Sequence, residues 1–410
     1  MKIRVQRTPV RLSGFRFAGV NCGLKESGER DIAVICSAIP AAAAAAFTTN
    51  RVQAAPVLVG LERARAGRLQ AIVVNSGNAN AYTGRQGVAA AREMCAIVAR
   101  ELHINERLVI PSSTGRIGVQ LPRNRIKRGV HAACKALSAD GFHDALEGMM
   151  TTDAFPKFAT ETVVLGETAV AIVGMAKGAG MIAPRMTLAG NAAHATMLAY
   201  VLTDAAASAT ALRRTLALAL PQSFNAIIVD GDTSTNDTVV LMANGLAGNP
   251  TLTPASRNFA AFTDAVTGVM RRLARMVVKD GEGATKVIDI TVRGARDQRD
   301  AARVAETIAR SPLCKTAFFG GDPYTGRVVC AAGYSGAVFD PEKLDVYFDD
   351  VQVVRRGREI VGQVERQAAA VISRPEFSLI LDLHAGTAVA QRVMSDLSLG
   401  YVRFNSAYRT

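Results

Sequence analysis

Residues 70–75 read Gln-Ala-Ile-Val-Val-Asn and are followed by Ser-Gly-Asn-Ala-Asn at 76–80 and by an alanine-rich stretch over 86–102. The first run is rich in β-branched residues and predicts a buried strand, the second is a turn, and the third has helical spacing. The same order recurs later, with a strand expected at 225–229 and a helix at 254–278. The sequence therefore predicts a mixed α/β fold.

Length and hydropathy bear on domain number and on membranes. The chain has 410 residues, 49% of them hydrophobic, which is enough for two or three domains with large cores. No uncharged apolar run reaches the ~18 residues that a membrane helix needs, since the most apolar stretch, 196–212, contains Asp204. Within that stretch, residues 196–206 show helical spacing. The basic N-terminus has no apolar segment behind it, so we expect no secretory signal.

Cysteine and histidine are scarce and scattered. None of the six cysteines forms a C-x-x-C pair, and the five histidines include no H-x-x-x-H. Cysteines of this kind are typical of buried small side chains in a reducing compartment. The sequence therefore predicts no metal site, and a histidine-based triad is less attractive than other chemistry.

The formal net charge of +13 favours anionic partners. The basic residues are dispersed, however, and the densest run, 123–128, has no interleaved aromatic residues in a chain without tryptophan. We interpret that run as the solvated face of a helix, and we expect no nucleic-acid partner.

Several strand-ending loops carry glycine and threonine, and one of them identifies a family. Lys177-Gly178-Ala179-Gly180 follows a strand expected at 169–173, but it lacks the order of a phosphate-binding P-loop. The segment 174–184, with Ala195-Thr196-Met197-Leu198 after it, resembles the ornithine acetyltransferase (ArgJ) family. The likeness covers almost the whole chain. Its other matching stretches are 47–52, 55–57, 75–80, 113–115, 151–153, 203–205, 280–286, 311–313, 333–336 and 401–410.

The resemblance implies a fold and a division of the chain. It implies a layered sheet-and-helix α/β core with a smaller C-terminal α/β domain. We expect residues 1–195 to form an α chain, 196–285 to begin the β chain and complete the core, and 286–410 to form the C-terminal domain.

The resemblance also implies a self-cleaving acyltransferase. Cleavage between Ala195 and Thr196 would free Thr196, which would carry an acetyl group from N-acetylornithine to glutamate in a ping-pong reaction of arginine biosynthesis. A threonine hydroxyl needs an adjacent base, and the new α-amine, with a pKa of about 7.7–8.0, is attached to the same residue. Without the surrounding motifs, Thr196 would be interpreted as a helix N-cap.

The remaining site residues follow from the same resemblance. Thr114 and Gly115 match the oxyanion hole. The positions that match substrate contacts are Thr151, Lys177, Thr196, Glu282, Asn405 and Thr410. Of these, Lys177 suits a substrate carboxylate and Glu282 a substrate ammonium.

One departure from the family affects the cleavage site. Residues 187–194 are an apparent insertion of eight residues directly before the scissile bond. Self-cleavage needs a near-attack geometry, so the insertion bears on processing. Thr187 is consequently a rival nucleophile. We choose Thr196 because its neighbours keep the family order.

The resemblance further implies a cytoplasmic α₂β₂ assembly without metal or cofactor, and some family members accept acetyl-CoA as a second donor. Two alternatives stay open. One is a self-cleaving amidohydrolase or aminopeptidase with the same nucleophile. The other is a non-catalytic relative, disabled by the insertion, that binds an anion or nucleic acid through its basic surface.

Overall fold

The computed structural model describes residues 10–48, 50–188 and 197–407 of the chain. These residues form two compact units. The first holds the residues up to Asn225 together with Asp232–Val277, and the second holds Ala226–Gly231 together with the residues from Val278 onward. Both units combine a mixed sheet with helices, which confirms the predicted α/β class.

The first unit is built on a sheet of nine strands among the described residues. Its main elements in chain order are β1 (Phe15–Val20), β2 (Ile32–Thr48), α1 (Ala55–Ala64), β3 (Arg68–Asn78), α2 (Gly84–Leu102), β4 (Val109–Arg116), α3 (Arg123–Lys135), α4 (Phe142–Met149), β5 (Lys157–Leu165), β6 (Thr168–Lys177), β7 (Met186–Leu188), β8 (Leu198–Thr203), α5 (Ala209–Ala219), β10 (Thr238–Ala243) and α6 (Phe259–Lys279).

The long strand β2 joins the two halves of this sheet, whose strand order is β4-β3-β2-β10-β8-β6-β5. The register of β2 with β3 shifts between Cys36 and Ala41, and the second half of β2 pairs with β10. The strands β3 and β4 are parallel, as are β8 and β10, while β6 runs antiparallel to β8. The ends of β4 and β6 carry the predicted residues Thr114 and Lys177.

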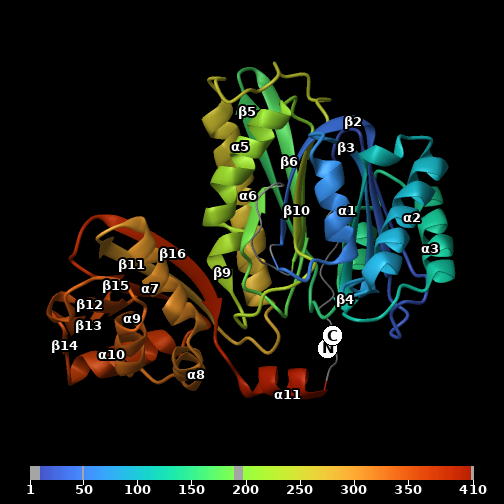
Figure 1. Ribbon diagram of the computed structural model, residues 1–410. Coiled ribbons are helices and arrows are strands. Elements are labelled where there is room, and N and C mark those ends of the chain that lie inside the picture. Colours follow the sequence, from blue (N-terminus) through green and yellow to red (C-terminus); the bar gives the residue numbers. More distant parts are fainter. Residues whose placement is uncertain (1–9, 49, 189–196, 408–410) are drawn as a thin grey trace. The chain divides into compact units, whose positions relative to one another are not determined.

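Two hydrophobic cores hold the unit together. One lies between α1–α3 and one face of β2 and β3. The other lies on the opposite face of the same strands and takes in β6, β8, β10 and helix α4. Figure 1 shows α1, α2 and α3 on one side of the strands of this unit and α5 and α6 on the other. The strands of this sheet thus pack against apolar cores, and the predicted residues Thr114 and Lys177 lie near the ends of two of them, β4 and β6.

Residues 198–203 form strand β8, although the spacing of apolar residues over 196–206 predicts a helix. All six residues of β8 are buried, between β6 and β10. A strand covered on both faces is apolar at every position, so its periodicity cannot be told from that of a buried helix. The prediction of helical structure there was wrong.

The basic run 123–128 lies on the surface as predicted, and most of the cysteines lie in the interior. Residues 123–128 begin α3 and are exposed except for Ile126, which confirms the solvated helix face. Four cysteines are buried, while Cys22 is half-buried and Cys330 exposed, so burial holds for most of them. Among the described residues, every helix is too short or too polar to span a bilayer.

The second unit has its own seven-stranded sheet among the described residues, in the order β14-β13-β12-β15-β11-β16-β9. Its main elements are β9 (Ile227–Ile228), β11 (Val287–Ala295), α7 (Gln298–Arg310), α8 (Pro312–Gly320), α9 (Gly326–Gly333), β12 (Asp345–Phe348), β13 (Val351–Arg355), β14 (Arg358–Glu359), α10 (Gln363–Ile372), β15 (Glu376–Asp382), β16 (Ala388–Ser395) and α11 (Leu399–Ala407). The loop before β11 holds Glu282, and α11 holds Asn405.

Candidate active site

Lys177 brings three of the predicted residues together in the first unit. Its Nζ donates to Thr151 Oγ1 at 2.7 Å and to Thr114 Oγ1 at 3.2 Å. The three residues come from separate segments: the end of β4, the loop after α4 and the last position of β6. Lys177 and Thr114 are both buried, so this cluster of one ammonium and two hydroxyls is largely screened from water.

Strand alternation explains why Lys177 points at this cluster. Val173 and Met175 face the core that β6 shares with β8 and β10, and Lys177 lies two residues further along the same face. Pairing with β8 places Lys177 opposite Leu198, at the end of the strand. On β4, Ile110 belongs to the same core, and Thr114 follows it on the same face. The two side chains therefore converge from different strands.

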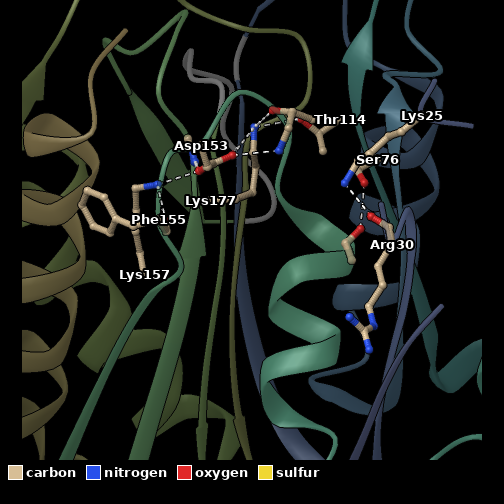
Figure 2. A network of polar contacts seen from close by, with 11 residues as sticks. Lys25, Arg30, Ser76, Thr114, Asp153, Phe155, Lys157 and Lys177 are labelled. Atoms are coloured by element: carbon tan, nitrogen blue, oxygen red, sulfur yellow. Dashed lines mark hydrogen bonds and ion pairs between the residues drawn. The ribbon is translucent and has the colours of Figure 1, made fainter. Parts of the chain in front are cut away.

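Asp153 contacts the cluster from the side of Lys157, although no role for it was predicted from the sequence. Its carboxylate is an ion-pair partner of Lys157 Nζ at 2.6 Å and of Lys177 Nζ at 3.9 Å. It also accepts hydrogen bonds from the backbone N–H groups of Gly178 at 2.7 Å and Thr151 at 2.8 Å. Figure 2 shows Lys157, Asp153 and Lys177 in a row that ends beside Thr114.

The charge of Asp153 follows from these contacts. Burial by itself raises the pKa of a carboxyl group, because it penalises the charged form. The charges of Lys157 and Lys177 and the N–H of Gly178 outweigh burial here, and they hold the pKa of Asp153 well below its ordinary value. Asp153 is therefore a carboxylate at neutral pH, and it balances charge beside Lys177 in the interior.

Gly115 occupies a position that only glycine fits. Its φ is +123°, and a Cβ there would lie 2.5 Å from the carbonyl carbon of Gly77 and 2.7 Å from the nitrogen of Asn78. Any side chain would push β4 away from β3, to which it is paired at this point. Thr114 is thus followed by closely packed backbone within β4, and fixed backbone donors are what the predicted oxyanion hole requires.

Polar side chains from neighbouring loops fix the backbone next to Thr114. Asn236 donates through Nδ2 to the carbonyl oxygens of Ala79 at 2.6 Å and Ser113 at 2.8 Å. Ser113 in turn donates to Asn75 Oδ1 at 2.6 Å. These buried bonds connect β3, β4 and the loop before β10, so the position of Thr114 is determined from several directions.

Asp237 is a second buried carboxyl group near Lys177, and it differs from Asp153. Neither of its oxygens has a hydrogen-bond partner among the described residues. Burial raises the pKa of Asp237 well above its ordinary value, and the charge of Lys177 opposes this only in part. The residue after it, Thr238, begins β10 and pairs with Leu198 of β8. Asp153 lies in the matched stretch 151–153 and Asp237 in the loop before β10, but neither has a local sequence signal that predicts its role.

Glu282 and Asn405 meet within the second unit, where Asn405 Nδ2 donates to Glu282 Oε2 at 3.1 Å. The loop that carries Glu282 is held by Asp396, which accepts from the backbone N–H groups of Thr285 at 2.8 Å and Lys286 at 3.0 Å. Ser398 donates to the carbonyl of Gly283. The two predicted substrate contacts therefore form a supported pair.

Three predicted residues, Ala195, Thr196 and Thr410, lie outside the described residues. The rival Thr187 is described. It lies in β7 opposite Phe47 of β2, and its buried hydroxyl has no hydrogen-bond partner among the described residues. The insertion therefore starts inside a short strand.

Comparisons with known proteins agree over nearly the whole chain. A model of the ArgJ family matches residues 16–410. The arginine biosynthesis bifunctional protein ArgJ of Geobacter sulfurreducens is 47% identical over 399 residues, which cover 97% of this chain and all of that protein. The protein of the same name from Symbiobacterium thermophilum is 47% identical over 97% of each chain.

Among solved structures, the chain is similar to a crystal structure of the arginine biosynthesis bifunctional protein ArgJ from Bacillus halodurans. The sequence identity is 38% and the TM-score 0.50. The match covers 52% of this chain and 100% of that one.

Proposed function

This chain belongs to the ArgJ family, and from that premise we propose its reaction and the residues that perform it. The protein transfers an acetyl group from N-acetylornithine to glutamate, giving ornithine and N-acetylglutamate, as a step of arginine biosynthesis. The observation that carries the assignment is the buried cluster of Lys177, Thr114 and Thr151, fixed by the carboxylate of Asp153.

The nucleophile of this reaction is Thr196, freed by cleavage of the Ala195–Thr196 bond. The products are residues 1–195 and 196–410. The solved Bacillus halodurans chain supports this step. It matches 52% of the present chain over its own whole length, and cleavage before residue 196 would give products of about that length. Cleavage gives Thr196 an α-amine, which serves as the base for its own hydroxyl.

The acetyl transfer proceeds in two halves. Thr196 Oγ attacks the acetyl carbonyl of N-acetylornithine, and its proton passes to the α-amine. Thr114 and Gly115 stabilise the negative charge on the acetyl oxygen. The carbon–nitrogen bond then breaks, the leaving ornithine takes the proton, and an acetyl ester remains. The amine of glutamate attacks this ester, and Thr196 regains its proton.

The other residues implied by the resemblance bind the substrates. Thr151, Lys177, Glu282, Asn405 and Thr410 contact substrate, and no cofactor or metal takes part. We place the enzyme in the cytoplasm as an α₂β₂ assembly, with acetyl-CoA as a candidate second donor.

Intact mass and isotope transfer test the proposal together. The purified protein should contain two fragments, one with Thr196 as its first residue, and it should move labelled acetyl from N-acetylornithine to glutamate. The variant Thr196→Ala should stay as one chain and transfer none. Release of free acetate without labelled N-acetylglutamate would instead show an amidohydrolase. An uncut, inactive wild-type protein would contradict the proposal, and a new N-terminus at Thr187 would move the nucleophile.

A further inference from the structure

The hydrogen bonds of Lys177 determine in which direction two hydroxyl groups can donate. A lysine ammonium has three donors and no acceptor, whereas a threonine hydroxyl has one donor and two acceptor lone pairs. Thr114 Oγ1 and Thr151 Oγ1 must therefore both accept from Lys177. The proton of each hydroxyl remains available, and among the described residues neither hydroxyl donates it to any acceptor.

We propose that Lys177 is a positioning residue for the oxyanion hole: it orients the hydroxyl of Thr114 so that its O–H faces the developing oxyanion. This inference rests on the function proposed above, and it adds a task to the substrate contact that the family resemblance assigns to Lys177. A hydroxyl that accepts from an ammonium is polarised, and it becomes a stronger donor to a negatively charged oxygen.

Asp153 is the second part of this arrangement. Asp153 is an ion-pair partner of Lys177 and fixes the backbone on both sides, because it accepts from Gly178 N–H next to Lys177 and from Thr151 N–H. Both lysines that contact Asp153 are buried. Oriented donors that are already in place before the reaction are worth more in such a dry site than in water. The row of side chains from Lys157 to Thr114 in Figure 2 is this arrangement.

The rate of self-cleavage distinguishes two roles of Lys177, which are orienting Thr114 and binding a substrate carboxylate. The precursor cleaves without any substrate, so only the first role affects that rate. If Lys177 orients Thr114, then Lys177→Met should slow self-cleavage about 10²-fold, as loss of one oxyanion donor does. Thr114→Val should slow it as much, and Thr114→Ser, which keeps the hydroxyl, should restore most of the rate. The reaction is followed by the appearance of two bands during cell-free synthesis, with thermal unfolding of each variant as the control for folding.

A double variant provides the second arm. Because both substitutions remove the same donor, Lys177→Met combined with Thr114→Val should be no slower than the slower single variant. Multiplied effects would show that the two residues act independently and would overturn the inference. Lys177→Met that cleaves at the wild-type rate would overturn it as well.

The acetyl transfer itself gives the third arm. N-acetylputrescine is the same amide as N-acetylornithine without the carboxylate. Lys177→Met that has matured should lose about 10²-fold in kcat with both donors, including the one without a carboxylate, whatever the change in KM for N-acetylornithine. A rise in KM for N-acetylornithine with kcat unchanged for both donors would assign Lys177 to the carboxylate alone. A wild-type protein that neither cleaves nor transfers acetyl would contradict the proposed function instead, which is a different result.

Discussion

Two buried carboxyl groups lie in two loops of the first unit, and they are in opposite states. Asp153, in the loop before β5, has two lysines and two backbone N–H groups around it, and its pKa is held low. Asp237, in the loop before β10, has no hydrogen-bond partner among the described residues, and its pKa is raised by burial. The same residue type at similar burial therefore has a lowered pKa in one loop and a raised pKa in the other.

The comparison teaches that the partners, rather than burial, decide what a buried acid does. Removing one partner of a carboxylate that is paired inside a protein is strongly destabilising, because it leaves a buried charge uncompensated. An acid without partners stays protonated, and it costs stability at every pH where the unfolded chain would ionise it. Four predictions sharpen this contrast.

The largest effect is expected for Asp153→Asn, which removes the buried carboxylate that forms ion pairs with Lys157 and Lys177. We expect the free energy of unfolding to fall by about 3–5 kcal/mol at pH 7, measured by urea denaturation. A loss below about 1 kcal/mol would show that the carboxylate does not hold the two lysines.

A second variant separates lost pairing from lost volume at the same place. Lys157→Met added to Asp153→Asn also removes one of the two buried lysine charges that Asp153 balances, so the double variant should be more stable than Asp153→Asn alone by about 1–2 kcal/mol. If the losses of unfolding free energy of the two single variants simply add in the double variant, the result would contradict the pairing of Lys157 Nζ with Asp153 at 2.6 Å.

The opposite sign is expected for Asp237→Asn. Because the folded pKa of Asp237 is raised, wild-type stability is reduced as pH rises above the ordinary carboxyl pKa, by about 1.4 kcal/mol per pH unit until the folded pKa is reached. The amide carries no such cost, so the variant should be more stable at pH 7 by at least about 1 kcal/mol. The gain should vanish near pH 4. A variant less stable than the wild type at pH 7 would show that Asp237 has a partner in the folded state.

The smallest effect is expected at Asp204, a buried acid with a raised pKa that accepts a hydrogen bond from the N–H of Ala171 at 2.8 Å. An asparagine oxygen accepts the same bond, so Asp204→Asn should change the free energy of unfolding at pH 7 by less than about 1 kcal/mol. A gain as large as that of Asp237→Asn would mean that the hydrogen bond does not matter and that burial alone decides.

The sequence predicted the strand at 70–75 and the helix at 86–102, which lie in β3 and α2, because a short β-branched run and an amphipathic run differ in length and period. Strand β3 continues to Asn78, into the stretch interpreted as a turn. It failed at 196–206, where β8 is buried on both faces. Alanines 41–46, good helix formers, lie in β2, because pairing with β10 overrides their intrinsic preference.

Within the candidate site, Thr114 and Lys177 were predicted because motifs of the resembling family contain them. Asp153 and Asp237 were not predicted, although Asp153 stands in the matched stretch 151–153. Their states depend on which side chains the fold brings beside them: Lys177 is 24 positions from Asp153 along the chain, and a hydrogen bond between Gly178 and Asp153 spans 25. No local pattern encodes such contacts, so only the folded chain shows them.

The central claim is that a threonine at residue 196 carries the acetyl group between two substrates. Mass spectrometry of the protein incubated with N-acetylornithine, without glutamate, tests it most directly. The account predicts that the fragment beginning at Thr196 gains the mass of one acetyl group, placed on that residue, and loses it to N-acetylglutamate when glutamate is added. An acetyl group on Thr187, or no acetylated fragment at all, would contradict it.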